Sequence, residues 1–222
     1  MTATDSTIAE QVVVLQQGMV AKAPPEVMAA FHAEQLGLAA EGVPDGVPAP
    51  GTPMPDGALL DAHSQPTTLA AARGGKPAVV VFYRGAWCPY CNITLRTYQA
   101  QLQPELTARG IELIAISPQK PDGSLSMQET NELSFTVLSD PGNQLAAKLG
   151  ILTAPTDDAR VAQVAVGLDL PAMNADGTDS LPMPTVVIVD ADSTIRWIDV
   201  HPDYTTRSET SEILAALDET IA

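Results

Sequence analysis

The fold is decided by residues 78–91, which read AVVVFYRGAWCPYC. The first six residues are apolar and rich in β-branched side chains, a composition that predicts a buried strand. A tight turn is expected at residues 84–86, and the amphipathic stretch over residues 92–108 predicts a helix. The only two cysteines of the chain, Cys88 and Cys91, therefore lie where a strand ends and a helix begins.

This position favours a reactive thiolate. The first turn of a helix has unpaired backbone N–H groups and carries about half a positive charge, and both stabilise a negative sulfur. Cysteines placed in this way have pKa values of roughly 3.5–7.5 instead of about 8.5. Residues three apart on a helix have Cβ atoms about 5–6 Å apart, which suits a disulfide. Cys88 and Cys91 are therefore expected to cycle between a dithiol and a disulfide.

Other roles for the two cysteines agree less well with the pattern. Two inert, buried thiols would not need a strand, a turn and a helix around them. A structural zinc site needs four ligands, whereas the three histidines, His32, His63 and His201, are scattered without paired spacing. We expect no metal and no cofactor.

Residues 81–91 resemble the active-site segment of the peroxiredoxin-like proteins, the AhpC/TSA group of the thioredoxin superfamily. The resemblance extends from Pro55 to the C-terminus. It implies a thiol-dependent oxidoreductase with a thioredoxin-like α/β fold, in which helices flank a mixed central sheet. The predicted order of strands and helices gives the same class, with an N-terminal helical extension added.

The register of this resemblance is informative. Peroxiredoxins carry a proline, three residues, a threonine, two residues and then the peroxidatic cysteine. On this chain that cysteine falls on Cys91, the threonine on Cys88 and the proline on Arg84. The catalytic arginine of the family falls on Pro184, which instead matches the cis-proline that thioredoxins place beside their Cys-x-x-Cys. These departures favour thiol–disulfide exchange over peroxide reduction.

Two enzymatic functions follow. In a thiol–disulfide oxidoreductase, Cys88, nearer the exposed end of the helix, attacks a substrate disulfide as a thiolate and Cys91 resolves the mixed disulfide. The alternative is a thiol peroxidase, in which a hydroperoxide oxidises Cys91 to a sulfenic acid and Cys88 condenses with it. Both need a cellular thiol reductant, of thioredoxin type or of low molecular weight. A non-enzymatic redox switch is a third hypothesis.

The substrate cleft is expected to surround Cys88. Trp87 gives it an apolar wall, Arg84 is the nearest cation in the sequence, and Pro184 leaves a strand edge free because proline has no N–H. The loop-rich residues 151–183 lead into this proline and form either one wall of the cleft or a plain surface insertion. The predicted cleft residues are Arg84, Trp87, Pro89, Tyr90, Met183 and Pro184.

The rest of the chain predicts three parts. Residues 1–40 form a helical extension, residues 41–57 a linker rich in proline and glycine, and residues 58–222 the redoxin domain. The helical extension is compatible with a homodimer. Near the C-terminus, Thr206 and Glu209 have the spacing of a capping box, which predicts a final helix. His201, Asp203 and Tyr204, which precede it, are expected to form a surface turn.

Composition and charge narrow the range of possible partners and cellular locations. With 222 residues and 45% hydrophobic content, the chain is long enough for one domain with additions and a sizeable core. A net charge of −16 argues against nucleic acid and anionic membrane surfaces as partners. No apolar run approaches the roughly 18 residues of a membrane span. The first ten residues carry no Lys or Arg and no apolar core of a signal peptide, so we expect a cytoplasmic protein.

Overall fold

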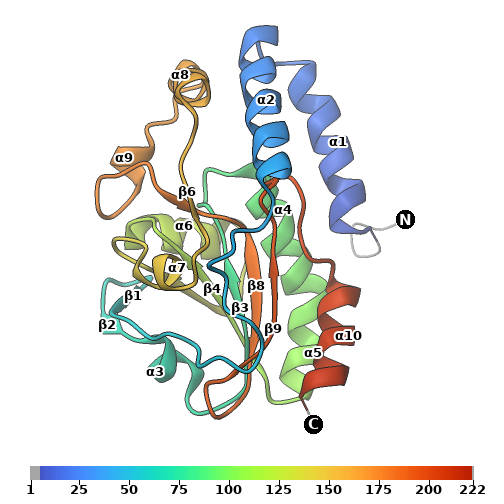
Figure 1. Cartoon of the computed structure of the whole chain (residues 1–222), viewed down its shortest axis with the longest axis vertical. Coiled ribbons are helices and arrows are strands. Elements are labelled where there is room, and N and C mark those ends of the chain that lie inside the picture. The colour runs from blue at the N-terminus through green and yellow to red at the C-terminus, as the bar shows by residue number, and fades with distance from the viewer. Residues whose placement is uncertain (1–5, 222) are drawn as a thin grey trace.

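The computed structural model describes residues 6–221, and its centre is a seven-stranded mixed sheet (Figure 1). The strand order is β2-β1-β5-β4-β3-β8-β9, and β6 and β7 pair separately. The strands are β1 (Leu59–Asp61), β2 (Pro66–Thr67), β3 (Ala78–Phe82), β4 (Glu112–Ser117), β5 (Thr136–Ser139), β6 (Leu152–Thr153), β7 (Leu181–Pro182), β8 (Thr185–Val189) and β9 (Ile195–Val200).

The strand predicted ahead of the cysteines is β3, at the middle of the sheet. It pairs in parallel with β4 and antiparallel to β8, and all five of its residues are buried. Side chains alternate between the two faces of a strand. Val79 and Val81 therefore belong to one hydrophobic core, and Val80 and Phe82 to the other.

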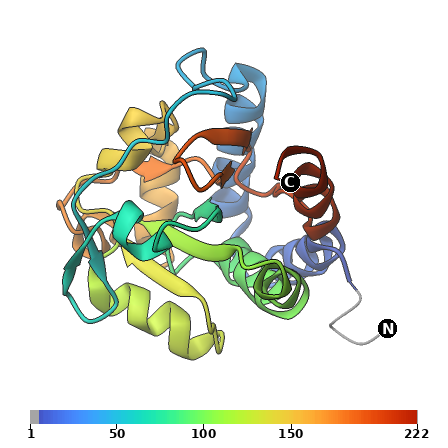
Figure 2. The same ribbon diagram turned by 90° about the horizontal axis from the view of Figure 1, so that it is seen from below.

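Helices cover both faces of the sheet, as Figure 2 shows. The core with Val81 also contains residues of α1, α4, α5, α6 and α10, whereas α3 and α7 contribute to the other core. The layered α/β architecture is thus as predicted. The helices are α1 (Ile8–Val20), α2 (Pro25–Glu41), α3 (Leu69–Arg73), α4 (Pro89–Thr97), α5 (Gln103–Ala108), α6 (Pro121–Thr130), α7 (Gln144–Lys148), α8 (Asp157–Ala165), α9 (Leu170–Met173) and α10 (Thr210–Thr220).

The helix predicted over residues 92–108 is continuous but irregular. A π-helical turn at Tyr98–Leu102 separates α4 from α5. Pro104 lies in the first turn of α5. Because proline lacks the N–H that an α-helix interior requires, a wider turn just before it relieves the missing hydrogen bond.

The N-terminal helices are tied to the main sheet domain by carboxylates. α1 packs on α4, and α2 packs on α8. Glu209, ahead of α10, accepts hydrogen bonds from the backbone N–H groups of Ile8 (2.9 Å) and Ala9 (2.8 Å). These two groups start α1 and have no partner within their own helix, so the carboxylate satisfies them and faces the positive end of the helix.

The predicted division into residues 1–40, 41–57 and 58–222 stays a prediction. Residues 1–5 and 222 of that division lie outside the described residues, as do the first five residues used to argue against a signal peptide. Within residues 6–221, the structure has no helix with both the length and the hydropathy to cross a membrane.

The structure corrects the predictions for Pro184. The peptide bond before Pro184 is trans, since residues 6–221 contain no cis peptide. The strand that follows, β8, lies between β3 and β9, and the Pro184 carbonyl accepts a hydrogen bond from the backbone N–H of His201 (2.8 Å). A cis-proline beside a free strand edge was therefore the wrong expectation, because β9 covers that edge.

The start of the last helix also differs from the prediction. α10 begins at Thr210. The capping box at its start is formed by Glu209 and Glu212, and Glu212 Oε2 accepts a hydrogen bond from the backbone N–H of Glu209 at 2.7 Å. Thr206 instead donates its hydroxyl to the carbonyl of Asp203 (2.9 Å). The capping-box spacing of Thr206 and Glu209 was thus three residues out of register, because the loop before the helix is longer than the pattern indicated.

Candidate active site

The turn between β3 and α4 presents both cysteines. Cys88 lies directly ahead of α4, and its backbone N–H donates to the carbonyl of Gly85 (3.1 Å). A Cβ atom at Gly85 would collide with the indole of Trp87, so this turn requires glycine. Asn92 holds the turn from the helix side, since its Nδ2 donates to the carbonyl of Cys88 (2.9 Å).

Both sulfurs are buried, with relative exposures of 1% for Cys88 and 0% for Cys91. Burial raises the pKa of the Cys88 thiol well above its usual value, and its hydrogen bond to Cys91 acts in the same direction. Burial alone would also raise the pKa of Cys91. The hydrogen bond from Cys88 and the positive charges of Arg207 and Arg84 outweigh that effect and lower it to about 5. These effects favour the ionised form at Cys91 over Cys88.

Arg207 places a cation in contact with Cys91. Its Nη2 donates to Cys91 Sγ at 3.5 Å, although the two residues are 116 positions apart in the chain. The same guanidinium donates through Nη1 to the carbonyls of Tyr204 and Thr206, which fixes it in the loop between β9 and α10. Sequence comparison assigned the family arginine to Pro184. The structure places a positive charge beside the sulfur from a different element.

Arg84 is buried between two aromatic rings. Its guanidinium carbon lies 3.8 Å from the ring centre of Tyr204 and 5.1 Å from that of Trp87. Both are cation–π distances, and they hold a largely buried charge in place. The Tyr204 hydroxyl in turn donates to Glu34 Oε2 on α2 (2.8 Å). Tyr204, expected on a surface turn, is thus buried and part of the site.

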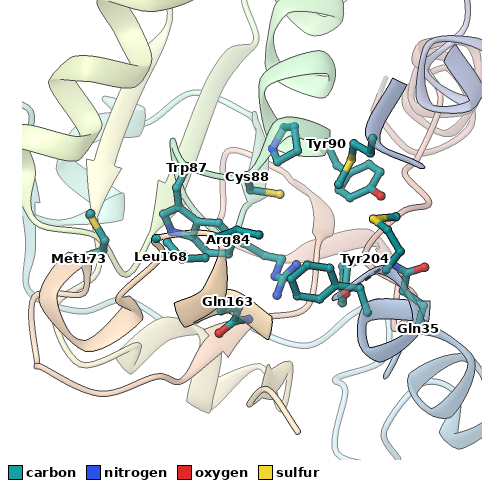
Figure 3. A pocket seen from close by; sticks show the side chains of 15 residues that line it. Gln35, Arg84, Trp87, Cys88, Tyr90, Gln163, Leu168, Met173 and Tyr204 are labelled. Atoms are coloured by element: carbon teal, nitrogen blue, oxygen red, sulfur yellow. Dashed lines mark hydrogen bonds between the residues drawn. The ribbon is translucent and has the colours of Figure 1, made fainter. Parts of the chain in front are cut away.

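A cavity of about 330 Å³ opens beside Cys88 (Figure 3). Cys88 lines it, and Cys91 lies behind Cys88 without lining it. Its walls come from α1, α2, the β3–α4 turn, the loop before α10 and the segment 163–173. The lining residues are Met19, Met28, Phe31, Gln35, Arg84, Trp87, Cys88, Pro89, Tyr90, Gln163, Val166, Gly167, Leu168, Met173 and Tyr204.

Four of the six predicted cleft residues therefore line the cavity and two do not. The four that line it are Arg84, Trp87, Pro89 and Tyr90. Met183 lies instead in the hydrophobic core on the opposite face of the sheet, with Leu149 and Val187. Pro184 is buried next to it. The proline leads into a central strand, and neither it nor Met183 lines this cavity.

The insertion over residues 151–183 forms one wall of the cavity, one of the two roles considered for it. Gln163 at the end of α8, the following residues 166–168 and Met173 of α9 all face the cavity. The opposite wall, from Met19, Met28 and Phe31 of the N-terminal helices, was not predicted. Helical spacing identifies the packed face of a helix, and packing positions look the same whether they meet a core or a cavity.

Comparison with known proteins agrees with this architecture. The model of the AhpC/TSA family matches residues 50–198, more than half of the chain. A putative peroxiredoxin of Haemophilus influenzae is 33% identical over 101 residues, which cover 46% of this chain and 64% of that protein. One of Mycobacterium tuberculosis is 31% identical over 101 residues, 46% of this chain and 63% of that protein. The match thus spans less than two thirds of the length of these relatives.

Solved structures give the fold. The crystal structure of reduced Prx3 from Vibrio vulnificus in complex with hydrogen peroxide has a TM-score of 0.62 at 18% identity, covering 77% of this chain and 99% of that one. At this identity the likeness establishes the fold alone, which is thioredoxin-like. Because the family model spans both the cysteine turn and the central strands, the chain belongs to the AhpC/TSA family.

Proposed function

We propose that this protein is a thiol peroxidase in which Cys91 is the peroxidatic cysteine and Cys88 the resolving cysteine. The observation that carries the proposal is the position of Arg207, whose Nη2 donates to Cys91 Sγ at 3.5 Å. Arg207 and the Cys88 thiol hold Cys91 as a thiolate, and the thiolate is the nucleophile of thiol chemistry. The names of the curated relatives, which are putative peroxiredoxins, point to the same activity.

The reaction has three steps. The Cys91 thiolate attacks one oxygen of the hydroperoxide, the O–O bond breaks, and the departing hydroxide or alkoxide takes a proton, which leaves Cys91 as a sulfenic acid. The Cys88 sulfur then attacks the sulfenic sulfur, and the hydroxyl leaves with the Cys88 proton as water. Two electrons from an external thiol reductant finally return the Cys88–Cys91 disulfide to the dithiol.

Arg207 and Arg84 serve the first step. Both lower the pKa of Cys91, so the nucleophile is already ionised before the peroxide arrives. Their charges also face the oxygen on which negative charge develops as the O–O bond breaks. The threonine and the arginine expected at positions 88 and 184 of a peroxiredoxin are thus replaced by a thiol donor and by Arg207.

Thiol–disulfide exchange that starts at Cys88 is the second candidate. It is favoured by one observation, that Cys88 and not Cys91 lines the cavity. It is opposed by the raised pKa of Cys88, since only a thiolate attacks a disulfide efficiently.

The experiment that tests the proposal is stopped-flow mixing of the reduced protein with hydrogen peroxide, for the wild type, Cys88→Ser and Cys91→Ser. Free thiols are counted after quenching with an alkylating reagent. We expect fast oxidation in the wild type and in Cys88→Ser, where it stops at the sulfenic acid, and none in Cys91→Ser. Slow oxidation of all three, together with rapid exchange on a disulfide substrate that requires Cys88, would establish the second candidate instead.

Other properties of the protein remain predictions. We infer a cellular thiol as the electron donor because the catalytic cycle consumes two electrons in each turnover. A homodimer through the N-terminal helices and a cytoplasmic location rest on the sequence alone.

A further inference from the structure

The cavity reaches the resolving cysteine and stops there. Cys88 lines it, while the Cys91 side chain is fully buried behind. In the oxidised enzyme, the sulfur of the disulfide that an incoming molecule meets is therefore Cys88 Sγ. The cavity leads to the atom that a reductant must attack, and not to the atom that a peroxide must reach.

The cavity also contains a positive charge that has no carboxylate partner. The side chain of Arg84 is only 6% exposed, its Nε has no hydrogen-bond partner, and among residues 6–221 it forms no ion pair. Figure 3 shows Arg84 and Gln163 around the same space as Cys88. The nearby carboxylate of Glu34 is occupied by the Tyr204 hydroxyl and the backbone N–H of Thr156 (3.1 Å).

Formation of the disulfide removes the negative charge of Cys91, which Arg207 and, less strongly, Arg84 stabilise. In the reduced enzyme the Cys91 thiolate interacts favourably with the charge of Arg84. In the disulfide Cys91 carries no charge, so a buried cation is left without a counter-ion, an unfavourable arrangement in a site of low polarity. An anionic group that enters the cavity is thus stabilised most strongly in the oxidised state, when a reductant has to bind.

We infer that this cavity binds the electron donor, and that the donor is a small thiol with an apolar body and one carboxylate. The inference rests on the proposed function for the origin of the disulfide. The volume of about 330 Å³ is at the lower end for small-molecule sites, and the lining is largely apolar. Arg84 binds the carboxylate, because a guanidinium recognises it with two parallel hydrogen bonds.

Burial of both cysteines favours a small thiol over a protein reductant as the donor. Cys88 is 1% exposed, and α2 and the segment 163–173 enclose the space in front of it. A thioredoxin-type protein would have to bring its own cysteine within bonding distance of this sulfur, and the residues that enclose the cavity would block that approach sterically. A molecule that fits inside the cavity meets no such obstacle.

Complete reduction of the Cys88–Cys91 disulfide consumes two molecules of donor. The first thiolate attacks Cys88 Sγ, the Cys88–Cys91 bond breaks, and Cys91 leaves as the thiolate that Arg207 stabilises. Cys91 is the better leaving group because its pKa is the lower of the two. A second donor thiolate attacks the donor sulfur of the mixed disulfide, which releases the oxidised donor and returns Cys88, which takes up a proton.

The test uses two thiols that differ only in the carboxylate, 6-mercaptohexanoate and 6-mercaptohexanol. The wild-type protein is oxidised to the disulfide with diamide, so that the test does not depend on peroxidase activity. Reduction is then followed by quenching and counting alkylated cysteines. We expect saturable reduction by 6-mercaptohexanoate, with a half-saturating concentration about tenfold lower than that of 6-mercaptohexanol. Arg84→Gln should abolish the difference between the two thiols, whereas Arg84→Lys should retain part of it.

Cavity-filling variants give a second, independent measurement. Leu168→Trp fills the cavity and is expected to raise the half-saturating concentration of 6-mercaptohexanoate, whereas Val164→Trp, on the exposed side of α8, should leave it unchanged. Equal rates for the two thiols that rise linearly with concentration would overturn the inference, as would saturable and much faster reduction by thioredoxin. Failure of the proposed function is distinguishable, since it would appear only as slow oxidation of the reduced wild type by hydrogen peroxide.

Discussion

Individual charges around Cys91 set the chemistry of the site. The thiolate receives a hydrogen bond from Arg207 Nη2 at 3.5 Å and another from the Cys88 thiol, and a second cation, Arg84, lies close by. Each of these groups favours the ionised form, and together they overcome the cost of burying a charge. Reactivity at neutral pH is therefore a property of a few side chains, not of the turn alone.

The first prediction concerns the pH dependence of peroxide reduction. The pKa of Cys91 is lowered to about 5, so the rate constant of the wild type is expected to be level near neutral pH and to fall as the pH drops below about 5. Arg207→Gln removes a cation that favours the thiolate, so the pKa of Cys91 rises toward its ordinary value. The rate at pH 6 should then fall by about tenfold.

Arg196→Gln is the matched control for this variant. The Arg196 guanidinium pairs with Asp190 on the protein surface, away from the cysteines, so its loss should leave the pH profile unchanged. Stopped-flow rates between pH 4 and pH 9 measure both variants. If Arg207→Gln kept the wild-type profile, Arg207 would not be the source of the low pKa.

At the scale of elements, the site depends on helices that belong to different parts of the chain. Glu34 of α2 accepts hydrogen bonds from the Tyr204 hydroxyl (2.8 Å) and from the backbone N–H of Thr156 at the start of α8 (3.1 Å). One buried carboxylate thus joins an N-terminal helix, the insertion and the aromatic ring that covers Arg84. Both walls of the cavity meet at this residue.

The second prediction follows from this junction. Glu34→Ala leaves the N–H of Thr156 and the hydroxyl of Tyr204 without their acceptor, and we expect the free energy of unfolding to fall by about 1–3 kcal/mol. Urea denaturation measures the change. Glu41→Ala, at the exposed end of the same helix, should stay within about 0.5 kcal/mol of the wild type. Equal effects of the two substitutions would mean that the buried carboxylate does not hold the elements together.

The whole molecule decides what can reach the sulfurs. Helices on the two faces of the sheet, the N-terminal helices and the insertion together leave Cys91 fully buried, and the cavity ends at Cys88. Enclosure of this kind strengthens the interactions between the thiolate and the arginines, because less water screens them. Under the proposed function, it would also restrict the hydroperoxide to a small molecule.

The third prediction compares hydroperoxides of different size. Hydrogen peroxide is expected to oxidise Cys91 at least about tenfold faster than cumene hydroperoxide, because the bulky group of the latter cannot pass Cys88. Stopped-flow mixing of the reduced wild type with each peroxide gives the two rate constants. In Cys88→Ala, where the obstructing sulfur is gone, the preference for hydrogen peroxide over cumene hydroperoxide should be weaker than in the wild type. Equal rates in the wild type would show that the turn opens to admit the substrate.

The sequence by itself determined the central strand, the turn and the helix that carries Cys88 and Cys91. It did so because strand and helix periodicity are local, and because a cysteine at a helix start follows from a short motif. It also indicated the α/β class, since the order of elements limits the ways in which they can form layers.

Only the tertiary structure decided what surrounds the two sulfurs and which of them contacts a positive charge. Arg207 and Tyr204 come from a loop more than 100 residues after the cysteines, and no local pattern marks them as site residues. The register of the family motif assigned the arginine to Pro184, which is a buried residue directly ahead of the central strand β8. Long-range pairing of the strands brings the loop before α10 to the start of α4, and electrostatic forces act through that spatial distance, not along the chain.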